Sequence, residues 1–186
     1  MSSLLARVNP VSIVSVALAV ASLFLPWWGV DITGVNINRV PIHRNLWNPP
    51  RFNTRIPGAT TVYWNFALSS ISVLILALIA ASLIIVGSVT LLRRYLLAGL
   101  ILSVLSLGVY ALAVDLVTRS YCLIAPLCVS GPIGAESFSG ASGLTVVWGF
   151  QSGYYIFILA ILALVGGLLF NRLLTSYTVT TQTLTS

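Results

Sequence analysis

The sequence predicts an all-α membrane protein: a bundle of four transmembrane helices with a small β-containing cap outside the membrane. Apolar residues make up 58% of the 186-residue chain and charged residues only 6%, whereas about a quarter of the residues in soluble domains are charged. Four apolar segments are each about 20 residues long, which is enough for a helix to cross roughly 30 Å of hydrocarbon. The two long loops between them contain turn residues and short β-branched runs, which are typical of strands.

The apolar segments indicate transmembrane helices over residues 11–30, 66–92, 95–117 and 152–169. Only a short break containing Arg93 and Arg94 separates the second segment from the third. A single helix across both would be longer than a bilayer is thick, so we expect a tight helical hairpin at the arginine pair. The four helices form one domain, residues 1–174, followed by a polar tail, residues 175–186. We expect this tail to fray unless a partner orders it.

An even number of crossings places both termini on one side of the membrane and the long loops, residues 31–65 and 118–151, on the other. The short connection at Arg93 and Arg94 favours the cytoplasmic side for the termini, because arginine is enriched in short cytoplasmic loops. The second long loop contains two cysteines, which can pair in an oxidising compartment. We therefore expect a multi-pass protein of the plasma membrane with cytoplasmic termini and outer loops.

Three runs in the loops predict strands of a cap: residues 30–37, 60–64 and 144–148. They are rich in β-branched and aromatic residues and are bounded by Gly, Asn or Pro. Four helices capped by such a sheet, with the larger loop first, resemble the claudin-like tetraspan architecture in outline. The claudin signature of a Trp, a Gly-Leu-Trp and a first-loop cysteine pair is absent, because Trp47 lies in NLWNPP and the first loop has no cysteine. The resemblance covers topology, and neither site residues nor a junction-forming role follow from it.

Aromatic residues gather at the outer ends of the predicted helices. Amphipathic rings settle at the depth of lipid headgroups, so this pattern favours an interfacial belt over a ligand cage. The belt is expected to contain Trp27, Trp28, Trp64, Trp148, Tyr154 and Tyr155. The inner edge has no tryptophan, so we expect part of the aromatic set to pack the loops against the helix ends instead.

The first long loop carries an arginine-rich stretch braced by prolines. Guanidinium groups are permanently charged and suit carboxylate, phosphate or sulfate partners. The candidate contacts to a partner subunit or to lipid are Arg39, Arg44, Arg51, Arg55 and Trp47. The alternative is an ordinary solvated loop, and the two interpretations have about even weight.

Cys122 and Cys128 enclose the sequence LIAPL in the second long loop. A disulfide between them is the first interpretation, since closing this loop would restrict the unfolded chain. Metal binding is the alternative, but His43 is the chain's only histidine and lies in the other loop. A metal site needs three or four ligands, so no metal site is assigned.

Asp115 is the only acidic residue at membrane depth, and Arg119 follows one helical turn later. An acid within the membrane is a candidate proton relay or ion ligand. The spacing also predicts an ion pair on one helix face at the membrane edge. We favour the ion pair, because the sequence places no second carboxylate near enough for a relay.

The composition argues against catalysis and transport by the chain alone. It has one histidine, no lysine and three scattered acids, and it lacks phosphate-binding and nucleophile motifs. No catalytic residue or cofactor is assigned. Transporters carry polar groups or broken helices at the bilayer midplane, and these segments do not. The arginines are too dispersed to follow a nucleic acid.

We therefore expect a non-catalytic accessory or structural subunit of a multi-subunit membrane or envelope complex, with lipid and other membrane-protein subunits as partners. A complex that houses a membrane-bound oxidase or monooxygenase is one candidate. The alternative is a small homo-oligomeric channel or a lipid-binding tetraspan protein made of copies of this chain.

Overall fold

The computed structural model describes residues 8–34, 37–48, 59–122, 130–138 and 143–183 of the chain. These residues form four helices and a four-stranded antiparallel sheet. The helices are α2 (Pro10–Leu23), α3 (Ala59–Thr90), α4 (Arg93–Cys122) and α5 (Ser152–Thr183). The strands are β1 (Trp28–Gly34), β2 (Ile37–Arg44), β3 (Gly134–Phe138) and β4 (Leu144–Phe150).

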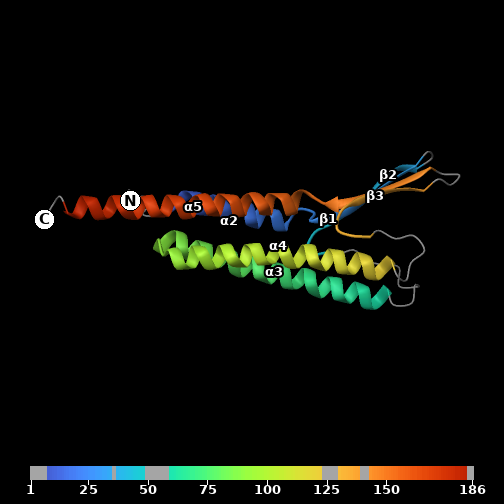
Figure 1. Cartoon of the computed structure of the whole chain (residues 1–186), viewed down its shortest axis with the longest axis horizontal. Helices are drawn as coiled ribbons and strands as arrows, with labels where there is room; N and C mark the ends of the chain where they lie inside the picture. Colours follow the sequence, from blue (N-terminus) through green and yellow to red (C-terminus); the bar gives the residue numbers. More distant parts are fainter. Residues whose placement is uncertain (1–7, 35–36, 49–58, 123–129, 139–142, 184–186) are drawn as a thin grey trace.

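The elements divide into two units (Figure 1). Helices α3 and α4 pack along each other as the hairpin, and α2 packs along α5 in the same way. Strand β1 follows α2 and β4 precedes α5, so the helix pair continues directly into the sheet. We call α2, α5 and the four strands the sheet unit. The sheet lies at one end of the molecule, called the outer end, and the α3–α4 turn lies at the inner end.

Three helical stretches of the described chain are long and apolar enough to cross a membrane: Asn65–Thr90, Arg93–Ser120 and Ser152–Phe170. The expected first span, residues 11–30, is wrong in its outer part, because α2 has only 14 residues and ends at Leu23. Pro26 follows closely, and a proline disfavours helical backbone in the residue before it. From Trp28 the chain pairs with strands on both sides, which satisfies its backbone without a helix.

The hairpin expected at the arginine pair is confirmed. Helix α3 ends at Thr90 and α4 begins at Arg93, so two leucines make the turn, and Leu91 has a positive φ of 56°. The helices approach closely near this turn. A Cβ at Gly87 would lie 2.8 Å from Leu96 Cδ2, and one at Gly99 would lie 2.5 Å from Ile84 Cγ1. Glycine at these positions therefore allows the close contact of the two helices.

The strands have the order β2-β1-β4-β3, and every neighbouring pair is antiparallel. Trp28 in the central strand β1 lies opposite Phe150 of β4 and Arg44 of β2. The strand expected at residues 144–148 is confirmed within β4. The one expected at residues 30–37 is confirmed only to Gly34, the end of β1, and Ile37 already belongs to β2, which was not predicted. The strand expected at residues 60–64 is wrong, since these residues form the first turns of α3, and β3 was not predicted.

Helix α5 continues to Thr183, well into residues 175–186, which were expected to be a polar tail. It also extends past the predicted end of the fourth span at residue 169. The sequence from 175 to 183 contains no Gly or Pro, the residues that most often end a helix. Helix formation is cooperative, and these residues extend a helix that is already formed.

The main hydrophobic core lies where the sheet meets the outer part of the helices. Its largest side chains include Trp27, Phe157, Tyr110, Phe66 and Leu46, which come from both units. A smaller cluster at the inner end contains Ile84, Leu96, Leu164 and Leu168. The two units are therefore joined by apolar contacts at both levels.

Asn9 makes a polar connection at the inner end. Its side chain caps α2 by accepting a hydrogen bond from the Ser12 amide, and its Nδ2 donates to the Gly167 carbonyl of α5 at 2.7 Å. Its backbone N–H donates to the Ser88 carbonyl of α3 at 3.2 Å. Because Asn9 is fully buried, these bonds align the start of α2 with the inner ends of α3 and α5.

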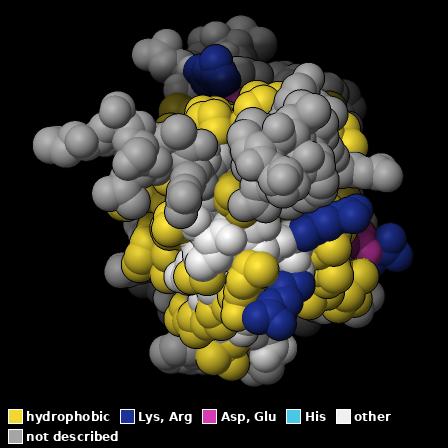
Figure 2. All heavy atoms as spheres, turned by 90° about the vertical axis from the view of Figure 1, so that its left-hand side faces the viewer, with side chains coloured by type: hydrophobic (Ala, Val, Ile, Leu, Met, Phe, Trp, Pro, Cys, Tyr) yellow, Lys and Arg dark blue, Asp and Glu magenta, His cyan; other side chains and the backbone are white. Residues whose placement is uncertain are grey.

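The inner end also carries Arg93 and Arg94, both exposed at the start of α4. Figure 2 faces this end and shows arginine side chains set among hydrophobic ones. Arg94 lies over the ring of Tyr95, with its Cζ 5.0 Å from the ring centroid. This end therefore combines positive charge with apolar helix surfaces.

Candidate interaction surface at the outer end

Most of the outer aromatic residues are buried. Trp27 is 0% exposed, and its ring lies 5.1 Å from Tyr110, 5.2 Å from Phe157 and 5.8 Å from Tyr154, measured between centroids. Its indole N–H donates to the Ser22 carbonyl at 2.8 Å. Trp27 therefore packs the end of α2 against α4 and α5 and does not face lipid headgroups.

Trp28 and Trp148 are also buried. The Trp28 indole donates to the Pro132 carbonyl at 3.0 Å, and the Trp148 indole donates to the Gly131 carbonyl at 3.2 Å. The interfacial belt expected at Trp27, Trp28 and Trp148 is thus replaced by packing within the protein, because their N–H groups find backbone acceptors there. Tyr154 is half-buried and Tyr155 is exposed, while the Trp64 side chain lies outside the described residues.

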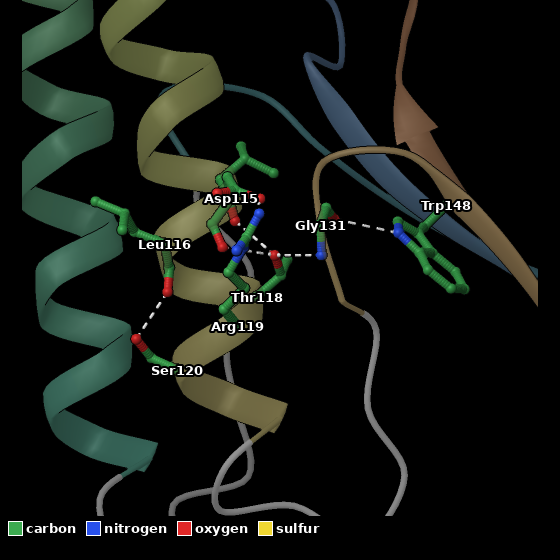
Figure 3. A network of polar contacts seen from close by, with 8 residues as sticks. Asp115, Leu116, Thr118, Arg119, Ser120, Gly131 and Trp148 are labelled. Carbon is green, nitrogen blue, oxygen red and sulfur yellow. Dashed lines mark hydrogen bonds and ion pairs between the residues drawn. The ribbon is translucent and has the colours of Figure 1, made fainter.

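The segment held by the two indoles also binds α4 (Figure 3). The Gly131 N–H donates to Thr118 Oγ1 at 3.1 Å, and this hydroxyl donates to the Val114 carbonyl at 2.8 Å. Gly131 has a φ of 86°, a conformation that favours glycine. Residues 131–132 therefore connect the last turns of the hairpin to the sheet. This connection was not predicted, since no local pattern marks a hydroxyl on a helix as the partner of a distant amide.

The structure contains the ion pair expected between Asp115 and Arg119. Arg119 Nε lies 3.0 Å from Asp115 Oδ1, one helical turn apart on α4. The Arg119 side chain is exposed and the Asp115 side chain is partly exposed. The ion pair engages the Asp115 carboxylate and therefore favours a structural role over a proton relay.

One tryptophan among the side chains that the structure describes is exposed. Trp47 is 54% exposed and stacks on Phe24, which is 68% exposed, with 6.4 Å between the ring centroids. The Trp47 indole donates to the Leu23 carbonyl at 3.0 Å, which satisfies one of the free acceptors at the end of α2. The adjacent Leu46 is 1% exposed within the core. An apolar anchor and a hydrogen bond thus hold the Phe24–Trp47 pair in place on the surface.

The arginines expected beside Trp47 have different environments. Arg39 donates two hydrogen bonds to Asp31, from Nε at 3.3 Å and from Nη2 at 2.8 Å. Arg44 has a buried Nε with no hydrogen-bond partner in the described part of the chain. Arg51 and Arg55 lie outside the described residues. Of the four arginines expected to contact a partner, Arg39 is therefore engaged by a carboxylate within the sheet, and Arg44 has a buried Nε next to β1.

Asp31 is the centre of a charged group on the exposed face of the sheet. His43 Nε2 lies 3.3 Å from Asp31 Oδ1, and this contact is an ion pair when the ring is protonated. Gly29 makes room for that ring, since a Cβ there would lie 2.5 Å from His43 Cδ2. The hydrogen bond from Arg39 holds the pKa of the Asp31 carboxyl below its ordinary value. Asp31 is thus a charged partner of β2 side chains at neutral pH.

The predicted disulfide cannot be placed, because Cys128 and the side chain of Cys122 lie outside the described residues. Among the described residues, no group of three or more His, Cys, Asp or Glu side chains is arranged to hold a metal ion. No protein-family model matches the sequence, and no curated protein matches it.

Proposed function

We propose that this chain is a non-catalytic subunit of a multi-subunit membrane complex, and that the Phe24–Trp47 pair contacts a neighbouring subunit. A complex that houses a membrane-bound oxidase or monooxygenase is one assembly of this kind. The proposal is supported by the apolar helix surfaces, by the fixed aromatic pair at the outer end and by the engagement of the described acidic groups Asp31 and Asp115 in ion pairs.

The apolar surfaces of the helices support insertion of the chain into a membrane. Large apolar side chains are exposed along all four helices, among them Ile13, Leu68, Ile101, Leu112 and Leu162. Such surfaces are stable in lipid, where apolar side chains have no reason to be buried. Helix α2 crosses together with the chain that follows it. Its 14 residues rise about 21 Å. The three residues up to Pro26 begin with a turn and add at most about 10 Å.

The charges at the inner end support one orientation in the membrane. Arg93 and Arg94 lie beside the short α3–α4 connection, so the positive-inside rule favours the cytoplasm for this end. The sheet then lies outside the cell, where Cys122 and Cys128 can form a disulfide. A plasma-membrane location with cytoplasmic termini is the arrangement that we propose.

The single observation that carries the proposal is the exposure of a fixed aromatic pair. Aromatic side chains that are held rigidly lose little entropy on binding, and tryptophan is enriched at the energetic centres of protein interfaces. Phe24 and Trp47 lie at the end of α2, where the Trp47 indole bonds to the Leu23 carbonyl. The pair therefore offers a rigid apolar anchor to a neighbouring subunit.

Assembly in the native membrane tests this proposal. Replacing Phe24 and Trp47 together by Ala is expected to release the chain from its partner subunits during affinity purification in mild detergent. Tyr155→Ala is the matched control, because it removes an exposed aromatic ring from α5 and should leave assembly unchanged. Undiminished co-purification of the double variant would contradict the assigned contact. Arg44→Ala with Arg51→Ala tests the arginine-rich stretch in the same assay and is expected to weaken assembly.

A further inference from the structure

A groove between α3 and α4 at the outer end of the hairpin is not used by the proposed subunit contact. It has a volume of about 310 Å³ and is lined by Asn65, Ser69, Ala113, Leu116, Val117 and Ser120. This volume lies at the lower end of the range for small-molecule sites. Figure 3 shows Leu116 and Ser120 on the side of α4 that faces α3. The described lining of the groove therefore belongs to the hairpin.

The depth of the groove follows from helix lengths, given the membrane orientation of the proposed function. The apolar stretch from Asn65 to Thr90 has 26 residues and the one from Arg93 to Ser120 has 28, which correspond to about 39 and 42 Å. The hydrocarbon core is about 30 Å thick, or roughly 20 helical residues. Counted from the inner turn, every lining residue of the groove lies near or beyond the outer edge of the hydrocarbon.

The inner wall of the groove is apolar, and its polar lining groups are partly satisfied. Ala113 and Val117 are buried and form this wall. The Ser69 hydroxyl donates to the Asn65 carbonyl and the Ser120 hydroxyl donates to the Leu116 carbonyl, each at 2.9 Å or less. Their oxygens can still accept hydrogen bonds. The wall therefore suits hydrocarbon, and the hydroxyls tolerate ester or glycerol oxygens.

Free hydrogen-bond donors lie at the rim. The side-chain amide of Asn65 is exposed and has no hydrogen-bond partner among the described residues. Arg119 contacts Asp115 through its Nε only, among the contacts that the structure describes. A guanidinium has five N–H donors in a planar fork that matches phosphate oxygens. Arg119 follows the lining residue Leu116 by three positions, which makes the two residues neighbours on the surface of α4. The rim thus combines an amide and a cation at headgroup depth.

We propose that this groove binds one phospholipid of the outer leaflet, with the phosphate held by Arg119 and Asn65 and with the glycerol and the first acyl carbons against Val117 and Ala113. The inference rests on the membrane location in the proposed function but not on the subunit contact. A phospholipid satisfies both requirements, an anionic oxygen group at the rim and hydrocarbon within, whereas a packed protein helix would use only the apolar wall.

The test is native mass spectrometry of the purified chain, in its complex, released from nanodiscs that contain phosphatidylglycerol. Ala113→Phe fills the groove and is expected to remove one retained phospholipid per chain. Leu112→Phe is the matched control, because Leu112 is exposed on a neighbouring face of the same helix turn, and it should retain that lipid. Arg119→Gln combined with Asn65→Ala keeps the groove open and is expected to weaken retention by about tenfold, as the loss of charge-assisted hydrogen bonds implies.

Each outcome either supports or overturns the assignment of a phospholipid to the groove. If Ala113→Phe does not fold, the Arg119 and Asn65 double variant decides between retention and loss. Retention of the phospholipid in that double variant, or in a folded Ala113→Phe, would overturn the groove assignment. Release of a protein subunit in place of lipid would also overturn it and assign the groove to a partner helix. Alkaline carbonate extraction distinguishes failure of the proposed function from failure of this inference. A chain that is extracted from the membrane contradicts the proposed function. A chain that stays inserted, and whose variants retain the phospholipid, contradicts only the lipid site.

Discussion

The hairpin and the sheet unit are built in different ways from similar apolar sequence. In the hairpin, two long helices are joined by two residues and packed through nearby sequence, as at Gly87 with Leu96. In the sheet unit, the ends of the chain come together, since α2 packs on α5 and β1 pairs with β4 more than a hundred residues away. The comparison teaches that local apolar runs define the hairpin, whereas the sheet unit depends on specific long-range contacts.

The largest expected effect comes from the aromatic core that joins the two units. Trp27→Ala should destabilise the chain by about 3–5 kcal/mol, because it empties a fully buried site between α2, α4 and α5. Trp47→Ala is the control of the same residue type, and its exposed ring should contribute much less to stability. Thermal unfolding of both variants in detergent measures the difference. Equal stabilities would show that Trp27 does not join the units as described.

A second pair of variants compares glycines in the two units. At Gly153, where α5 meets the α2–β1 corner, a Cβ would lie 2.6 Å from Trp27 Cδ1 and 2.8 Å from the Pro26 carbonyl oxygen. Gly153→Ala should therefore cost about 2–3 kcal/mol, since backbone atoms cannot move aside easily.

At Gly108 in the hairpin, a Cβ would meet nothing within 4 Å. Gly108→Ala should stabilise helix α4 by up to about 1 kcal/mol, because alanine has the higher helix propensity. Opposite shifts of the unfolding temperature are predicted. A similar loss in both variants would mean that the sheet unit is no more closely packed here than the hairpin.

The connection between the units at Thr118 should have a smaller effect. Thr118→Val keeps the shape of the side chain but leaves the Gly131 N–H without its acceptor, at a cost of about 1–2 kcal/mol. Thr90→Val is the matched control, since the Thr90 hydroxyl bonds only to the Val86 carbonyl of its own helix. Hydrogen exchange should also show faster exchange of the Gly131 amide in Thr118→Val. Unchanged exchange would contradict the connection.

The smallest expected effect lies on the exposed face of the sheet. Arg39 lowers the pKa of Asp31 below its ordinary value of about 3.8, so the charged carboxylate favours the folded state. This contribution is complete above about pH 3.8, the unfolded value, and is lost as the pH falls through the lower folded value.

Asp31→Asn should therefore be slightly less stable than the wild type at pH 6, and the difference should shrink toward pH 3 and at high salt. The pH dependence of the unfolding temperature, measured for both proteins, tests this. A difference that grows on acidification would contradict the pKa shift.

Local sequence predicted the hairpin because its signals are local: two apolar runs and an arginine pair. It predicted β1 and β4 in part, since alternating β-branched residues mark strands, but not β2 or β3. It assigned residues 60–64 to a strand because β-branched and aromatic residues are compatible with both states, and an apolar helix already forming beyond Asn65 decides between them. The first span was expected to continue past Leu23 because Trp27 and Trp28 are apolar, and apolar residues fit a buried strand as well as a membrane helix.

The candidate surface was predictable only in outline. Trp47 and Arg44 were identified from the sequence. The burial of Leu46 and the hydrogen bond from Trp47 to the Leu23 carbonyl depend on tertiary contacts, which the sequence does not reveal. The buried tryptophans were taken for a membrane belt because a sequence shows that a ring lies near a helix end but not what packs over it. The groove between α3 and α4 depends on two residues of α3 meeting four of α4, which no single segment reveals.

The central claim is that the chain works as one subunit among others. The measurement that tests it most directly is the mass and composition of the particle extracted from the native membrane in a mild detergent. We predict a particle with other proteins in fixed stoichiometry, from which the Phe24 and Trp47 double variant is lost. A particle that contains only copies of this chain and lipid would contradict the account and favour a homo-oligomeric channel or lipid-binding protein.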